Sequence, residues 1–544
     1  AYDSYGDLTQ TVKNAVSGGA HDSQTNVTTS STYNILGQQL TSADALGVIT
    51  QYSPDVVGNV TKTIQNYQLG GPSGYDSPAT NVTTTASFDA LDRPWTQTSA
   101  PMQAYANGSL TVTQVVTLTE YDNDGRAIGT VVNCTALAGE SCFVNNTAVN
   151  TQGTLTANSA TQTNLLSATA YDAAGNATLA TDAKGNTTTT TYDADNRATE
   201  VVAKDVSNPS TPTISDKTTM YDLAGDVTQT QVMDGASNPI TSYTYDAAGR
   251  QVTEADPPAD PTDTTTSDPG YVANVTATSY DQDGNATEQA VTNANVSGAV
   301  SDTKMTYDAL GRTLTKVEDA NTSGSQTTSY TYDANGQQLS VTQPATNGTT
   351  QNTTTYDALG RVATATQQAG TGNAQTTSYT YDAGGRTLTT SNSAGSTSDS
   401  YDALGRTLTE TRYDTNQVVQ TVVATTYDTH GNALTTVTSY ATSPSVTVTR
   451  AFDALDHLAS LSDGQRTYSY DLNGNSTSME VVNPSTGNTR ITAASDSYDG
   501  GNRLTTQKDY VGTAPDPLET DLYTYNAAGD RVTASANAAQ TTYT

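Results

Sequence analysis

Polar and apolar residues alternate in short runs along most of this 544-residue chain. In the run from Gln326 to Tyr332 (QTTSYTY), every second side chain lies on the same side of an extended backbone, which places Tyr330 and Tyr332 on one face. Thr, Val and Tyr, which favour strands, are abundant in these runs. The pattern predicts an all-β protein.

A reverse turn is predicted at the end of each run. The runs lead into Asp-x-x-Gly, in which the Asp side chain accepts backbone N–H bonds and Gly takes the left-handed conformation. The Arg-x-Leu-Thr segment that follows starts a returning strand. Each unit is therefore predicted to be a β-hairpin.

The hairpin unit recurs 19 times with a period of about 25 residues. Degenerate copies begin at Phe88, Phe452, Tyr33 and Tyr525. Three copies share the hexapeptide Tyr-Asp-Ala-Leu-Gly-Arg, and their repeat-defining residues are Tyr307, Asp308, Gly311 and Arg312, Tyr356, Asp357, Gly360 and Arg361, and Tyr401, Asp402, Gly405 and Arg406.

Hairpins in tandem predict one continuous antiparallel ribbon, which must twist and coil. About 40 strands at about 4.8 Å each make an edge of roughly 190 Å, long enough to curl around a hollow lumen. Residues 1–170 have irregular spacing and inserted loops, whereas residues 171–544 form a regular array. Both parts are expected to belong to one repeat architecture.

Tyrosine and arginine recur at fixed positions of the unit. Tyrosine pairs such as Tyr330 and Tyr332 predict ladders stacked across neighbouring hairpins, with hydroxyls towards solvent or lumen. A sugar-binding aromatic strip is the alternative. The arginine after the turn glycine is expected to pair with Asp of its own or the next turn, as a register device of about 0–1 kcal/mol; these residues are Arg126, Arg250, Arg312, Arg361, Arg386 and Arg406.

Composition narrows the possible partners. The formal net charge is −33 and hydrophobic residues make up 34%, values that favour disorder, but 32 Tyr and the strict repeat argue against it. Only 22 Lys and Arg are present, so nucleic acid is not expected as a partner. No run approaches the roughly 18 apolar residues of a membrane helix, so no membrane span is expected.

Two cysteines, Cys134 and Cys142, lie close together in an insertion. A local structural disulfide between them is predicted and would place the protein in an oxidising compartment. Two free thiols in a loop remain the alternative. A zinc site is not expected because only three His are available to complete it.

The sequence carries no convincing catalytic or cofactor-binding motif. Asp-x-Asp-Gly at Asp122–Gly125 and Asp281–Gly284 lacks the spacing of an EF-hand, so these segments are predicted as turns, with weak calcium binding as the alternative. His430 lies within a turn, where a polar residue needs no further role. No Gly-x-Ser-x-Gly elbow or phosphate-binding glycine loop is present. No enzyme activity, catalytic residue, metal or cofactor is predicted.

The unit Tyr-Asp-Ala-Leu-Gly-Arg-Thr-Leu-Thr resembles the YD repeat of rearrangement-hotspot (Rhs) proteins, toxin-complex C subunits and teneurins. The resemblance implies a hollow shell, export, and in the toxins an enclosed C-terminal effector. The core segment with Asp-Pro-x-Gly elements that follows the repeats in toxin-type members has no match here.

The function expected from the sequence is therefore a secreted structural wall that forms an extracellular filament or tube and self-associates end to end. Alternatives are a fragment of a shell that encapsulates a toxin polypeptide, and a surface adhesin that binds glycans.

Overall fold

The computed structural model describes residues 1–19, 21–106, 109–134, 164–206, 213–233, 238–257, 274–293, 299–320, 324–345, 348–462, 466–483, 489–512, 517–525, 529, 531–536 and 539–542. Within these residues all regular structure is β-strand. The strands are β1 (Gln10–Lys13), β2 (Val27–Tyr33), β3 (Gln39–Ala43), β4 (Ile49–Pro54), β5 (Val60–Gln65), β6 (Val82–Phe88), β7 (Pro94–Thr98), β8 (Met102–Ala106), β9 (Ser109–Thr113), β10 (Val116–Tyr121), β11 (Ala127–Val132), β12 (Leu165–Tyr171), β13 (Ala177–Thr181), β14 (Thr187–Tyr192), β15 (Ala198–Lys204), β16 (Thr213–Tyr221), β17 (Val227–Val232), β18 (Ile240–Tyr245), β19 (Gln251–Ala255), β20 (Asn274–Tyr280), β21 (Ala286–Asn293), β22 (Ala299–Tyr307), β23 (Thr313–Glu318), β24 (Gln326–Tyr332), β25 (Gln338–Ala345), β26 (Gly348–Tyr356), β27 (Val362–Gln367), β28 (Gln375–Tyr381), β29 (Thr387–Asn392), β30 (Gly395–Tyr401), β31 (Thr407–Tyr413), β32 (Val419–Tyr427), β33 (Ala433–Tyr440), β34 (Val446–Phe452), β35 (Leu458–Leu461), β36 (Arg466–Tyr470), β37 (Ser476–Asn483), β38 (Thr489–Tyr498), β39 (Leu504–Val511), β40 (Glu519–Tyr525), β41 (Arg531–Ala536) and β42 (Ala539–Thr542).

Forty of these strands form one antiparallel sheet in which each strand pairs with its neighbours in the chain. The only detour among the described residues is the hairpin of β8 and β9, which lies between β7 and β10, two strands that pair directly. The sheet continues from β11 to β12 across the expected boundary at residue 170. The predicted ribbon of tandem antiparallel hairpins is confirmed.

Apart from the turn at Tyr413, which joins β31 to β32, the Tyr-Asp turns between the numbered strands connect an even-numbered strand to the next strand, and each contains a bulge. In the unit at Tyr307, the Gly311 N–H donates to the Asp308 carbonyl oxygen (3.0 Å) and the Asp308 N–H donates to the Arg312 carbonyl oxygen (2.9 Å). The strand register shifts by one residue at Tyr307. A type I turn followed by a left-handed residue has this geometry and matches the twist of the two strands.

The left-handed residue of the turn is usually glycine, as at Gly311 with φ +75°. Several turns instead have an Asn, Asp or Gln with positive φ at this position: Asp92, Asn196, Gln417, Asp456 and Asn502. Asn and Asp tolerate this conformation better than other residues with a side chain, so the degenerate repeats keep the same turn.

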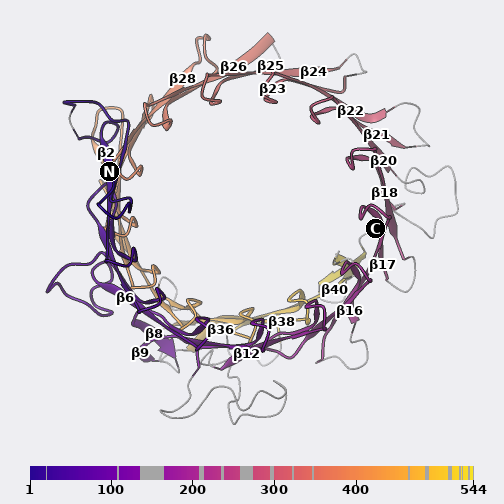
Figure 1. The fold of residues 1–544 in the computed structure, drawn as a ribbon, viewed down its shortest axis with the longest axis horizontal. Coiled ribbons are helices and arrows are strands. Elements are labelled where there is room, and N and C mark those ends of the chain that lie inside the picture. Colours follow the sequence, from indigo (N-terminus) through magenta and orange to yellow (C-terminus); the bar gives the residue numbers. More distant parts are fainter. Residues whose placement is uncertain are drawn as a thin grey trace.

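The ribbon coils into a ring that surrounds an open centre. The later part of the chain runs alongside the earlier part over some of the ring (Figure 1). We call the chain up to β26 the first winding and the chain from the turn at Asp357 onward the second winding. Twenty-three strands, β14 to β36, lie between two turns that contact each other across the windings. At about 4.8 Å per strand they give a circumference of roughly 110 Å and a diameter of roughly 35 Å.

The ribbon has two different edges. The turns that follow even-numbered strands of the sheet lie along one edge, which we call the YD edge. The remaining connections, including the Tyr-Asp turn at Tyr413, lie along the other edge, which we call the loop edge. The loop edge includes the segments 66–81 between β5 and β6 and 99–115 between β7 and β10. The YD edge of the second winding lies against the loop edge of the first.

The apolar core is small. Nine hydrophobic residues are buried in the described part of the chain, and four of them lie where the two windings meet: Ala100, Met102, Ala104 and Ala454. Most other strand residues are half-buried. Backbone pairing therefore builds the ribbon, and apolar packing is concentrated at the contact between the windings.

Candidate functional site: the seam between two windings

Each Tyr-Asp turn is held by the carboxylate of its aspartate. In the copy at Tyr401, Asp402 Oδ1 accepts the N–H groups of Leu404 and Arg406 (both 2.9 Å), and Oδ2 accepts the Arg406 Nε–H (2.6 Å). The copies at Asp308 and Asp357 have the same three bonds. Charge-assisted bonds of this kind are stronger than neutral ones, so the carboxylate fixes both the turn and the arginine.

The arginine of each turn also binds the following repeat. Arg312 Nη1 donates to the carbonyl oxygen of Asp333 in the next turn (2.9 Å), and its guanidinium lies over the ring of Tyr332 at 4.8 Å. The expected pairing with the aspartate of the same turn is confirmed. Contact with the next turn is made through a backbone carbonyl, and the side chains of such arginines are only 15–34% exposed. These pairs are half-buried and should contribute more than an exposed ion pair.

The predicted tyrosine–tyrosine ladder is wrong for the tyrosines of the Tyr-Asp motif. Tyr332 donates its hydroxyl hydrogen to the carbonyl oxygen of Thr313 in the preceding repeat (2.9 Å), and not to solvent. An arginine covers the ring of Tyr121, Tyr171, Tyr221, Tyr280, Tyr332, Tyr381, Tyr401, Tyr427 and Tyr525. The ladder therefore alternates cation and ring, because a buried tyrosine hydroxyl needs an acceptor and the ring face attracts a cation.

Among the described residues, seven YD turns of the second winding reach the loop edge of the first, and together these contacts form the seam. Arg361 Nη2 donates to the carbonyl oxygen of Ser23 (2.8 Å), although 338 residues separate them. Arg406 Nη2 makes the same contact with the carbonyl oxygen of Pro78 (2.9 Å). The arginine has three nitrogens, so it can hold its own turn, the next turn and the other winding at once.

The middle of the seam is apolar. Met102 of β8 is fully buried and packs in a cluster with Ala104 and with Ala454, which lies in a YD turn of the second winding. Next to it, Thr429 donates its hydroxyl hydrogen to the carbonyl oxygen of Pro101 (2.6 Å). The inserted segment 99–115 thus supplies both apolar and backbone contacts to the second winding.

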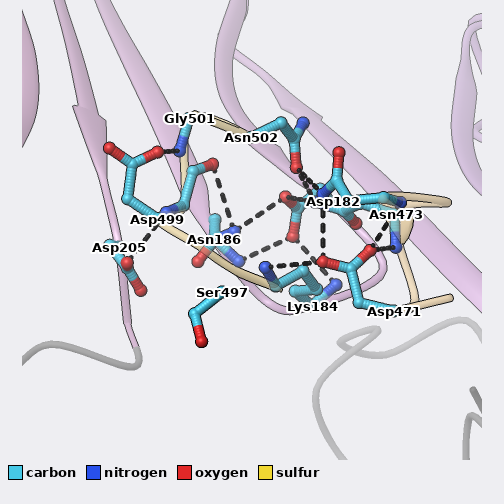
Figure 2. A network of polar contacts seen from close by, with 12 residues as sticks. Asp182, Lys184, Asn186, Asp205, Asp471, Asn473, Ser497, Asp499, Gly501 and Asn502 are labelled. Carbon is cyan, nitrogen blue, oxygen red and sulfur yellow. Dashed lines mark hydrogen bonds and ion pairs between the residues drawn. The ribbon is translucent and has the colours of Figure 1, made fainter. Parts of the chain in front are cut away.

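Farther along, the seam is polar (Figure 2). The Lys184 ammonium lies 3.2 Å from the Asp471 carboxylate, and Asn473 donates its Nδ2–H to Asp182 Oδ2 (2.7 Å). Burial acts to raise the pKa of Asp471, but hydrogen bonds from Asn475 and Lys184 outweigh it and hold that pKa below its usual value. The Asp471 carboxylate therefore stays ionised in neutral solution.

The network of Figure 2 ends at a backbone contact. The Gly500 N–H donates to Asp205 Oδ2 (2.8 Å), and Asn186 donates its Nδ2–H to the carbonyl oxygen of Gly500 (3.3 Å). A Cβ at Gly500 would lie 2.8 Å from the Cβ of Asp205, so the close approach requires glycine at this position.

His430 bridges the two windings. Its Nδ1 lies 3.0 Å from Asp456 Oδ1 in the next YD turn, and its Nε2 lies 2.9 Å from the carbonyl oxygen of Ala100 in the first winding. Both partners are acceptors, so both bonds form only when both ring nitrogens carry hydrogen. The hydrogen bond to Asp456 raises the pKa of His430 against the opposing effect of burial. The turn residue to which the sequence assigned no further role is therefore a seam contact.

We expect this part of the seam to loosen as pH rises. The pKa of folded His430 is raised above its usual value of about 6.5, so its contribution is complete below that pH and is lost as pH rises through the folded pKa. Asp428 and Asp456 are the charged groups that act on it, and His457 in turn lies near Asp456. Hydrogen exchange at residues 100–104, corrected for its intrinsic pH dependence, should show less protection at pH 8.5 than at pH 6.

The matched control is His430→Ala, in which the change in protection between the two pH values should largely disappear. His457 also has a raised pKa, through Asp453, but its described contacts lie within the second winding: its ring stacks on Tyr470 at 4.7 Å and its Nδ1 lies 3.0 Å from Asp453 Oδ2. The His457→Ala variant should therefore keep the wild-type change at residues 100–104. An unchanged pH response in His430→Ala would contradict the bridging role.

The repeat-defining residues fall into two environments. Tyr356 and Tyr401 begin turns that lie in the seam, whereas Tyr307 begins a turn on the YD edge of the first winding. Cys134 follows β11, and Cys142 lies outside the described residues, so the disulfide between them stays a prediction.

The two Asp-x-Asp-Gly segments, predicted as turns with weak calcium binding as the alternative, form ordinary turns. Asp122 pairs with Arg126 (2.6 Å), and Asp281 accepts a hydrogen bond from Asn285 (2.9 Å). In the described part of the chain, no group of three or more His, Cys, Asp or Glu side chains could hold a metal ion. Among the same residues, no helix has the length and apolar character needed to cross a membrane.

Several seam residues could not be found from sequence. Met102, Lys184, Asp205 and His430 stand out only because the ribbon returns past its own start. The turn at Asp55 was also missed, because Pro54 replaces tyrosine there although the aspartate accepts the same backbone bonds. The signal that could have found it is the Asp-x-x-Gly spacing without its tyrosine.

One family of known proteins matches parts of the chain. The model of the RHS Repeat family matches residues 171–205 and 307–347. A search of curated proteins found no match. Among solved structures, the chain is similar to TcdB2-TccC3 (16% identity, TM-score 0.39, covering 96% of this chain and 37% of that one) and to the Photorhabdus luminescens Tc holotoxin pore with the TccC3 change D651A (14% identity, TM-score 0.34, 95% and 38%).

At these TM-scores the structural similarity carries no argument, and this chain spans less than two fifths of either of those chains. The family match does not depend on it. Both matched segments contain the bulged turn with its carboxylate bonds, at Asp172, Asp193, Asp308 and Asp333, and the same turn recurs at other described positions of the YD edge, such as Asp357 and Asp402. The chain therefore contains RHS repeats of the Tyr-Asp type, matched at residues 171–205 and 307–347.

Proposed function

We propose that this chain forms the wall of a hollow extracellular tube and that its role is structural and not enzymatic. The observation that carries the proposal is the seam: one ribbon passes more than once around an open centre and binds to itself along its two unlike edges (Figure 1). A ribbon that only curved would be an open strip. Contacts between the windings turn it into a wall.

The two edges suit this role because their chemistry differs. The YD edge presents arginine N–H donors that remain after each turn is satisfied, and the loop edge presents backbone carbonyls. Arginine–carbonyl contacts do not depend on the identity of the receiving side chain. The loop edge can therefore vary in sequence while the wall stays closed.

Electron microscopy of the purified chain tests the hollow wall. Isolated particles should appear as rings with a central region of low density. Compact particles without a lumen would refute the proposal.

A cysteine pair tests the seam in the same preparation. An added Cβ at Gly384 would lie 3.1 Å from Leu46 Cδ1 of the first winding, so Leu46→Cys with Gly384→Cys should form a disulfide on mild oxidation. Leu310→Cys with Gly384→Cys is the matched control and should not, because Leu310 is on the free YD edge. Equal cross-linking in both variants would mean that the windings do not stack as described.

A shell that encloses a polypeptide is the second candidate function, and the RHS Repeat match together with the open centre favours it. Copurification of a protected polypeptide inside the rings would support it. Glycan binding through the tyrosines of the motif has less support, because those rings are covered by arginine and their hydroxyls donate to backbone carbonyls.

A further inference from the structure

The hexapeptide Tyr-Asp-Ala-Leu-Gly-Arg occurs once on the free YD edge of the first winding and twice in the seam. Its leucine is 74% exposed at Leu310, whereas Leu359 and Leu404 are half-buried. The arginine and aspartate side chains change in parallel: they are 26% and 19% exposed at Arg312 and Asp308, but 15% and 7% at Arg406 and Asp402. Since the local sequence is identical, the second winding shows what this edge does when it is docked.

The free YD edge of the first winding carries a row of such exposed apolar residues. They occupy central positions in five of the described turns of this edge and are 65–108% exposed: Ile35, Leu36, Val56, Val57, Leu91, Leu223 and Leu310. In the seam, the residues at central turn positions include Thr429 and Ala454, which are 7% and 8% exposed. Isolated exposed apolar residues are common, but a row at one repeated position along one edge indicates a contact surface.

The opposite end of the molecule carries the surface that would receive this edge. The loop edge of the second winding consists of the same kind of connections between strands as the loop edge of the first winding, whose backbone carbonyls accept hydrogen bonds in the seam. The loop edge of the second winding also exposes apolar side chains beside its connections: Val418, Tyr440, Val446, Val511 and Leu518. The two free edges therefore repeat the pair of surfaces that the chain already joins within itself.

We propose that the YD edge of the first winding docks on the loop edge of the second winding in another copy of this chain. The arginines and the exposed row of turn residues would enter the neighbouring loop edge as Arg361 and Arg406 enter the edge of their own first winding. Unlike edges join head to tail, so the contact does not close and copies stack along the axis of the ring. The inference rests on the proposed hollow wall and explains how stacked copies would lengthen that wall.

Charge determines when stacking occurs. The chain carries a formal charge of −33, so two copies repel each other at low ionic strength. Screening shortens the range of that repulsion from about 10 Å at 0.1 M salt to about 3 Å at 1 M. Contacts between arginine, carbonyl and apolar side chains act at short range and survive. Association should therefore strengthen with added salt.

Sedimentation and light scattering of the purified chain over a range of concentrations, at about 0.1 M and about 1 M NaCl, test this. The weight-average mass should rise with concentration and with salt, and electron microscopy should show stacked rings. The double variant Leu223→Asp with Leu310→Asp should weaken association by about tenfold or more, since two exposed leucines per contact become charged.

The matched control is Leu110→Asp with Val112→Asp on β9, whose side chains are 52% and 53% exposed and lie on neither free edge. It should associate as the wild type does. A chain that stays monomeric at every concentration and salt, or association that both double variants weaken equally, would overturn the proposal. Rings that remain hollow but never stack would refute the docking and leave the proposed wall intact.

Discussion

Replacing Met102 by alanine should lower the free energy of unfolding by about 2–5 kcal/mol, one of the two largest effects we expect. Met102 is fully buried and packs with Ala104 and, across the seam, with Ala454. Truncation removes buried methylene and thioether groups and leaves a cavity between two rigid backbones, which have little freedom to close it. Equilibrium denaturation by urea gives the value if the transition is two-state; otherwise, hydrogen exchange at residues 100–104 reports the local loss.

Met220→Ala is the control for this prediction. Met220 lies on β16 and is 55% exposed, so its truncation should cost well under 1 kcal/mol. Similar costs for the two variants would show that the apolar middle of the seam does not hold the windings together. A large cost only at Met102 would locate the stabilising contact where the ribbon passes its own start.

The second large effect is expected at Asp402. Asp402→Ala removes the acceptor of two turn N–H groups and leaves the Arg406 guanidinium half-buried without its carboxylate, which should cost about 3–5 kcal/mol. Asp308→Ala breaks the same local bonds in the same hexapeptide at an edge that faces solvent. This variant should lower the free energy of unfolding by about 1–3 kcal/mol, because water can replace some of the lost hydrogen bonds.

An asparagine substitution separates the contribution of the turn hydrogen bonds from that of the ion pair. Asn34 naturally occupies the aspartate position of its turn and accepts the N–H groups of Leu36 and Gln38. Asp402→Asn should therefore keep the turn and lose only the charge, at a cost between those of wild type and Asp402→Ala. Equal costs for Asp402→Ala and Asp308→Ala in urea denaturation would mean that the seam adds nothing to a YD turn.

Sequence was sufficient to predict the ribbon because each of its contacts is local. A strand pattern of period two, an Asp-x-x-Gly turn and an arginine four residues after the aspartate all act within one hairpin or between neighbours. Turns at Asp308 and Asp402 could thus be predicted in detail. The cation–ring ladder could have been foreseen from the same repeats, since Arg312 and Tyr332 recur in adjacent units.

The seam could not be predicted for a physical reason. Which YD turn meets which loop depends on how many strands complete one winding, and small changes in twist per strand shift that number. Turn chemistry gives no further guidance, because the loop edge also uses Asp-x-x-Gly turns, at Asp44 and Asp182, with the same carboxylate bonds. The roles of Lys184 and His430 therefore emerge only from the coiled ribbon.

The length of one winding also affects the time course of folding. Seam partners joined by hydrogen bonds or ion pairs are 287 to 338 residues apart, whereas strand pairs are neighbours. At a synthesis rate of about 5–20 residues per second, hairpins pair as they emerge, yet the first winding waits on the order of 15–70 s for the residues that cover it. During that interval its loop edge, with Met102 and the carbonyls of Ser23 and Pro78, is open to any chain nearby. A nascent ribbon is thus most exposed to misassembly just before its second winding arrives.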